Sequence, residues 1–166
     1  MVLATHAVTG AALAQLVPEH PFAAFCIGFC SHFILDTIPH WDYPLKSNRE
    51  NKENRLAGDI VVGKDLASDL MKIGSDATLG IILSIFFFFP HTPMQSLVLL
   101  CGAIGGMLPD PLQFAYYKIR KEPLISLQKF HMWIHAKLHL KDYPLPGATL
   151  QLLFVILVVS IIKAIL

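Results

Sequence analysis

The chain has 166 residues, 54% of them hydrophobic and only 15% charged, with a mean hydropathy of +0.56. This composition is too apolar for an ordinary soluble domain, and a net charge of +1 gives no basis for a nucleic-acid partner. The cysteines at positions 26, 30 and 101 all lie inside apolar runs, which argues against a disulfide framework. We therefore expect residues 1–166 to form a single all-α, membrane-embedded domain with the lipid bilayer as its surroundings.

The apolar runs predict a polytopic bundle of about five hydrophobic helices, because about 20 apolar residues cross the hydrocarbon core. In chain order the runs cover residues 5–17, 22–38, 64–89, 94–108 and 147–166. Proline-bounded tight turns separate the first two runs and the next two. Two longer polar segments, about 41–64 and 109–146, connect the remaining runs, and the second is amphipathic and basic.

The 13 Lys and Arg residues predict the orientation of the chain in the membrane. All except Lys163 lie in the two polar segments or in the first turns of the helix 64–89, and the tight turns have none. By the positive-inside rule both polar segments are cytoplasmic, so the N-terminus starts inside and the C-terminus ends outside. Residues 1–6 lack a basic stretch and a cleavage site, so we expect no cleaved signal peptide.

The most informative motif lies at the end of the predicted helix 22–38, where His32, Asp36 and His40 recur at four-residue spacing. Residues four apart share a helix face, and Pro39 disfavours helical backbone just before it, so His40 should follow the helix end. A carboxylate near a helix C-terminus and a membrane boundary is unfavourable alone. A divalent metal bound by these residues would offset both costs; the ligand types suit zinc, with manganese or iron as alternatives. The alternative interpretation is a solvated polar helix end.

An acidic stripe marks the helix 64–89, where Asp65, Asp69 and Asp76 fall within about 40° of one another at 100° per residue. Carboxylates inside a membrane helix indicate a function by default. We expect Asp69 and Asp76 to be catalytic residues, one of them serving as a general base. The alternative is ion pairing with lysines of the same helix.

Further ligands are expected at the same depth on the cytoplasmic side, because the predicted topology brings several more His and Asp residues there. The predicted metal ligands are His6, His32, Asp36, His40, Asp110, His131 and His135. Asp42 and His139 are further candidates whose part in the site the sequence leaves open. Alternatives exist for two of these regions: Asp110 follows a proline as a turn residue often does, and the basic segment around His131 fits a surface helix on anionic headgroups.

Three motifs resemble those of small bacterial inner-membrane metal-dependent hydrolases, the LexA-binding inner-membrane-associated hydrolase-like group. They are Thr5-His6 with Gly10, Ser31-His32-x3-Asp36-x2-Pro39-His40-x-Asp42, and Gly106-x2-Pro109-Asp110. The His32-x3-Asp36 spacing is also similar, over a shorter stretch, to the zinc-dependent phospholipase C and S1/P1 nuclease superfamily, whose members are all-helical with clustered zinc. These resemblances imply His32 and Asp36 as bridging or terminal ligands, with further ligands from the set His6, Asp76, Asp110, His131 and His135.

The leading hypothesis is a metal-dependent hydrolase of the bacterial inner membrane with its site at the cytoplasmic interface. Its substrate would be a phosphoester such as a lipid phosphate or phospholipid, and basic residues of the polar segments would attract the anionic headgroup. The alternatives are a metal- or proton-binding, transporter-like protein and a regulatory protein that binds a partner. A transporter needs polar groups across the whole bilayer, whereas the outer halves of the predicted spans are almost entirely apolar.

Overall fold

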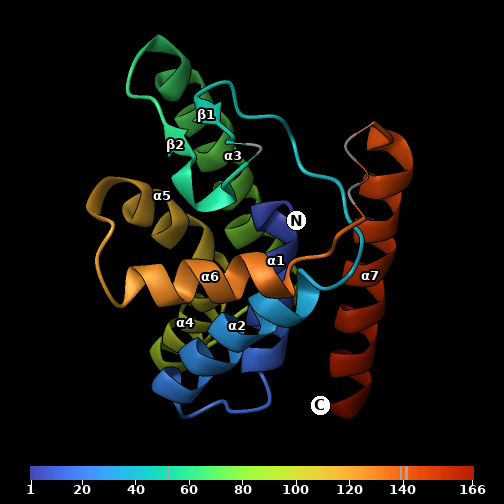
Figure 1. Ribbon diagram of the computed structural model, residues 1–166. Coiled ribbons are helices and arrows are strands. Elements are labelled where there is room, and N and C mark those ends of the chain that lie inside the picture. Colours follow the sequence, from blue (N-terminus) through green and yellow to red (C-terminus); the bar gives the residue numbers. More distant parts are fainter. Residues whose placement is uncertain (52, 139, 141) are drawn as a thin grey trace.

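The computed structural model describes residues 1–51, 53–138, 140 and 142–166, and these residues are almost entirely helical, as predicted (Figure 1). The helices are α1 Leu3–Ala14, α2 Pro21–Leu35, α3 Lys64–Phe87, α4 Pro93–Met107, α5 Pro109–Ile119, α6 Leu124–Ile134 and α7 Pro144–Ile165. A two-residue hairpin, β1 Asn48–Arg49 antiparallel to β2 Asp59–Ile60, and a short 3₁₀ turn at Arg55–Ala57 lie between α2 and α3. His139, Lys52 and Lys141 lie outside the described residues.

Prolines set where the helices begin. Pro21, Pro93, Pro109 and Pro144 each stand in the first turn of their helix, where a missing backbone N–H costs nothing. The end of α2 comes earlier than predicted, at Leu35 rather than residue 38. His40 therefore lies in extended chain beyond the helix, as the Pro39 argument requires.

Helix α1 is the centre of the bundle, with α2, α3, α4 and α7 packed around it. Eleven of its twelve residues are buried, including Ala7, Ala11 and Ala12 in the main hydrophobic core. Glycines allow the helix backbones to approach closely: a Cβ at Gly28 would lie 2.2 Å from the Gly102 carbonyl oxygen. Gly10 on α1 approaches the same carbonyl equally closely, so α1, α2 and α4 pack tightly against one another.

Fewer helices reach membrane-spanning length than the five expected. Among the described residues α3 and α7 are long and apolar enough to cross a bilayer, and α4 with α5 makes a third candidate that bends by 48° at its break. The 12 residues of α1 and the 15 of α2 are apolar but extend only about 18 and 22 Å, short of a hydrocarbon core of about 30 Å. The expectation of five apolar helices is correct, but their lengths support only two or three spans.

The chain after α6 runs beside the chain after α2. The Ala136 N–H donates to the Asp36 carbonyl at 2.6 Å, and the Leu140 N–H donates to the His40 carbonyl at 3.1 Å. In Figure 1 α6 lies crosswise in front of α2, whereas α7 stands along one side of the bundle. These two hydrogen bonds place the end of α6 against the motif that follows α2.

Candidate metal centre

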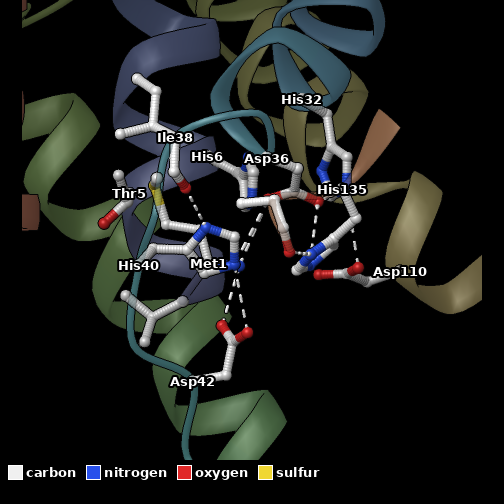
Figure 2. A network of polar contacts seen from close by, with 12 residues as sticks. Met1, Thr5, His6, His32, Asp36, Ile38, His40, Asp42, Asp110 and His135 are labelled. Carbon is white, nitrogen blue, oxygen red and sulfur yellow. Dashed lines mark hydrogen bonds and ion pairs between the residues drawn. The ribbon is translucent and has the colours of Figure 1, made fainter. Parts of the chain in front are cut away.

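Asp36 lies at the centre of a buried cluster of histidines (Figure 2). It caps the C-terminal end of α2, and its side chain is only 1% exposed. Its Oδ2 lies 2.9 Å from His131 Nε2 and 3.1 Å from His32 Nε2, and its Oδ1 lies 3.3 Å from His6 Nε2. One carboxylate therefore contacts imidazoles from three helices.

Local contacts position each of the three histidines next to Asp36. His32 stands one turn before Asp36 on α2, which puts both side chains on one face. His6 comes from the buried helix α1, and its ring stacks on that of His32 with centroids 3.9 Å apart. His131 comes from the last turn of α6, which the backbone pairing of Ala136 with Asp36 draws against α2.

Three overlapping groups of side chains have the spacing of a metal site. Within each group one possible ligand atom per residue lies within 4.8 Å of the others. The groups are His6, His32 and Asp36; His32, Asp110 and His131; and Asp36, His40 and His135. The structure thus brings together all seven residues that the sequence predicts as metal ligands, and a cation could be held in any of these groups.

The tautomer of His32 is fixed by its neighbour on α4. Its Nδ1 lies 2.8 Å from the Gly106 carbonyl oxygen, which can only accept, so Nδ1 carries the proton. In the neutral ring the lone pair of Nε2 then faces Asp36 Oδ2 at 3.1 Å and His131 Nε2 at 3.3 Å. Two lone pairs facing each other in a buried site repel unless a proton or a cation lies between them. A hydrogen bond to the far ring nitrogen is also how metal-bound histidines are oriented.

His40 repeats this arrangement on the other side of Asp36. Its Nδ1 lies 2.7 Å from the Ile38 carbonyl oxygen, so its Nε2 faces Asp42 Oδ2 at 3.2 Å and Asp36 Oδ1 at 3.9 Å. The buried Nε2 of His40 and both ring nitrogens of His6 have no hydrogen-bond partner. Buried polar atoms are normally satisfied, so these nitrogens are suited to a ligand absent from the protein chain itself.

The charges of the cluster favour an ionised Asp36. Burial alone raises the pKa of Asp36, but the contacts of its carboxylate with His131, His32 and His6 outweigh that effect and hold this pKa well below its ordinary value. Burial lowers the pKa of His32, but the nearby Asp110 and Asp36 carboxylates outweigh it and raise that pKa. Burial lowers the pKa of His135 to about 4, so its ring stays neutral at physiological pH. A carboxylate and neutral imidazoles are the protonation states in which these groups bind metals.

Asp69 and Asp76 lie in none of the three groups. Asp76 accepts hydrogen bonds from the Leu3 and Ala4 N–H groups at 2.7 and 3.2 Å, where α1 begins. Asp69 is buried and accepts from both the N–H and the hydroxyl of Ser47 at 2.7 Å. Each aspartate thus fastens another part of the chain to α3, and the catalytic role predicted for them stays a prediction.

Asp42, whose part the sequence left open, adjoins the cluster. It lies 2.8 Å from the Met1 amino nitrogen as well as beside His40, and the same amino group lies 3.3 Å from Asp36 Oδ1 (Figure 2). Burial alone raises the pKa of Asp42, but His40 and the Met1 amino group outweigh it and lower that pKa. Asp42 is therefore a second carboxylate at the edge of the site.

Sequence reasoning missed the contacts of two residues that position the cluster. Gly106 orients His32 through its backbone carbonyl, which no side-chain pattern shows. Gln151 on α7 accepts from the Val2 N–H and donates to the Trp41 carbonyl, and so ties α7 to the chain on both sides of the site. The sequence does contain one indication of this role, because Gln151 is the single glutamine in the apolar run 150–159.

The comparisons with known proteins add no relative: no family model, no curated protein and no solved structure matches this chain.

Proposed function

We propose that the cluster is a divalent metal centre, with zinc as the preferred ion and manganese or iron as alternatives. The observation that carries the proposal is the orientation of His32 and His40. Both rings donate through Nδ1 to a backbone carbonyl and turn Nε2 toward Asp36. Nitrogen and oxygen ligands of this kind suit those metals.

We infer a hydrolase acting on phosphoesters at the membrane surface, in line with the resemblance of the His32, Asp36 and Pro109-Asp110 motifs to membrane metal-dependent hydrolases. A bound divalent metal would lower the pKa of water and polarise a phosphoryl oxygen. The cluster is open at one side, because the Asp110 side chain is 35% exposed and that of His135 is 20% exposed. That side is where water and an anionic substrate would enter.

The hydrolysis also needs a general base that accepts a proton from water. Asp110, at the bend between α4 and α5, lies 3.6 Å from His32 Nε2 and faces the opening, so it is the carboxylate best placed to accept a proton from water. Asp76 accepts hydrogen bonds from α1 through both of its oxygens, and Asp69 accepts two from Ser47 through Oδ2, which favours a structural role for both. We therefore assign the general base to Asp110 rather than to α3.

We place the protein in a bacterial inner membrane with its N-terminus and the metal centre on the cytoplasmic side. Two or three helices among the described residues can span a bilayer. The Lys and Arg residues gather in the segments 41–64 and 109–146, which the positive-inside rule assigns to the cytoplasm. The ligands lie on or beside these segments.

The test is metal content and hydrolysis of wild type against Asp36→Asn, with Asp65→Asn as the matched control. Asp65 is an exposed aspartate on α3 outside the three groups. We expect wild type and Asp65→Asn to bind zinc stoichiometrically and to release phosphate or alcohol from phosphoesters, and Asp36→Asn to lose both properties. Equal, negligible metal in all three proteins would refute the metal centre. Bound metal without hydrolysis of phosphate monoesters or diesters would refute the hydrolase and favour a binding role.

A further inference from the structure

A narrow apolar groove lies beside the metal cluster, between α7 and the turn that follows α2. Its volume is about 280 Å³. The apolar residues that line it are Ile38, Pro39, Leu150, Leu153, Phe154 and Leu157. Among the residues that the structure describes, no Asp, Glu, Lys or Arg side chain lines it.

The α7 side of the groove is a regular helical stripe. Positions 150, 153, 154 and 157 follow the i, i+3, i+4, i+7 pattern of one helix face, which runs for about 10 Å along the axis. Leu150, Leu153 and Leu157 remain more than half exposed. Because α7 is a candidate membrane span, these side chains face lipid, and the groove opens toward the hydrocarbon of the bilayer.

The polar end of the groove adjoins the metal cluster. Ile38 and Pro39 separate Asp36 from His40, and the Ile38 carbonyl bonds to His40 Nδ1. Met1 and Gln151 line the groove at this end, and the Met1 amino nitrogen lies 3.3 Å from Asp36 Oδ1. A chain lying in the groove would therefore have its polar end at the cluster.

We propose that this groove binds one acyl chain of a membrane lipid and so directs a lipid phosphoester, rather than a water-soluble one, to the metal centre. Drug-sized ligand pockets measure about 300–1,000 Å³, so a groove just below this range admits a hydrocarbon chain and not a second helix, whose diameter is about 10 Å. The apolar lining and the opening to the bilayer both match an acyl chain. The substrate role of that lipid rests on the proposed hydrolase, but the binding of the chain does not.

The test uses two neighbouring leucines of α7 that are equally exposed. Leu153, at 58%, lines the groove, whereas Leu152, at 59%, does not. Leu153→Trp fills the groove, and Leu152→Trp adds the same bulk elsewhere on α7. Each protein is reconstituted in vesicles containing a phospholipid with a diazirine near the end of one acyl chain, and photolabelled residues are mapped by mass spectrometry.

We expect Ile38, Leu150 and Leu157 to be labelled several-fold more than exposed leucines outside the groove in wild type. That enrichment should be lost in Leu153→Trp and kept in Leu152→Trp. Uniform labelling of all exposed leucines would overturn the proposal, because it would show ordinary bilayer contact only. A cross-link from the groove residues to a second copy of the chain, in place of lipid, would overturn it as well.

A second measurement separates the groove from the hydrolase. Rates are compared on phosphatidic acid in vesicles and on glycerol 3-phosphate, which carry the same phosphomonoester. We expect Leu153→Trp to lower the rate on phosphatidic acid, relative to the rate on glycerol 3-phosphate, several-fold. Leu152→Trp should leave this ratio unchanged. An unchanged ratio in an active enzyme contradicts the groove's role in substrate choice. If wild type hydrolyses neither compound, the substrate role falls, and the photolabelling alone decides whether the groove binds a chain.

Discussion

Gly106 offers a way to disturb the candidate metal centre without changing any of its candidate ligands. It lies in the last turn of α4, where a Cβ would stand 2.4 Å from the His6 carbonyl oxygen and 3.1 Å from the His6 carbonyl carbon. Both are backbone atoms, so Gly106→Ala can be accommodated only if α1 and α4 separate by about 1 Å to restore an ordinary contact of about 3.5 Å. The same shift moves the carbonyl that orients His32.

The expected free-energy change follows from two opposing effects. Overpacking of this kind costs about 1–3 kcal/mol. Replacing a glycine within a helix by alanine returns roughly 0.5–1 kcal/mol. Gly106→Ala should therefore destabilise the fold by about 0–2.5 kcal/mol, once both effects are counted. Because His6 and His32 both shift, we expect zinc affinity to fall about 10–100-fold, the usual effect of losing an outer-shell partner.

Gly74→Ala is the control, because a Cβ at Gly74 on α3 meets no atom within 4 Å. It should be neutral or stabilising, with unchanged zinc affinity. Unfolding in mixed detergent micelles, followed by tryptophan fluorescence, gives the stability of each variant, and calorimetric zinc titration gives the affinity. If Gly106→Ala matches Gly74→Ala in both measurements, the close crossing of α1 and α4 does not position the ligands, and the reasoning is refuted.

Three further predictions concern other contacts. Asp76→Ala should destabilise the protein by about 1–3 kcal/mol, because two N–H groups of α1 lose their acceptor. If the Asp76→Ala variant instead binds metal but hydrolyses no phosphoester, Asp76 is a catalytic residue. Ser47→Ala should cost about 0.5–1.5 kcal/mol and speed proteolysis within residues 48–60, because Asp69 loses one of its two bonds to Ser47. Zinc affinity should fall as the pH drops through the pKa of His32, which Asp110 and Asp36 raise against the effect of burial, because the metal binds only the deprotonated nitrogen. Burial lowers the pKa of His6 and of His135 to about 4, so these two rings should stay available down to about that pH. A flat calorimetric affinity between pH 7.5 and 5.5 would contradict ligation by His32.

The helices and the central ligands follow from the sequence because both depend on local patterns. Apolar runs and first-turn prolines place the helices to within a few residues, and the four-residue spacing of His32 and Asp36 identifies the middle of the cluster. His6 and His131 also join it, since the alternation of apolar and basic segments predicts a common depth for them. The residues of the site were therefore predictable as a group.

The partners of Asp69 and Asp76 were not predictable in this way. An acidic stripe on a membrane helix looks the same whether it serves catalysis or accepts bonds from the backbone of another segment, and here it accepts N–H groups from Ser47, Leu3 and Ala4. The number of membrane spans was also overestimated. Composition marks α1 as apolar, but only its length of 12 residues shows that it is too short to cross a bilayer. The hydrogen-bond partners and the span lengths both depend on tertiary contacts or helix ends rather than on residue type.

The wide separation of the ligands along the chain sets the order of events during synthesis. Asp36 and His131 are 95 residues apart, which a ribosome translating about 5–20 residues per second needs roughly 5–20 s to cover. During that interval the first helices already present His6, His32 and Asp36. The two groups that contain His131 or His135 can be completed only after α6 has been made, whereas the group of His6, His32 and Asp36 needs only the first two helices. A metal ion bound before α6 is made would therefore have fewer ligands than one bound by the finished protein.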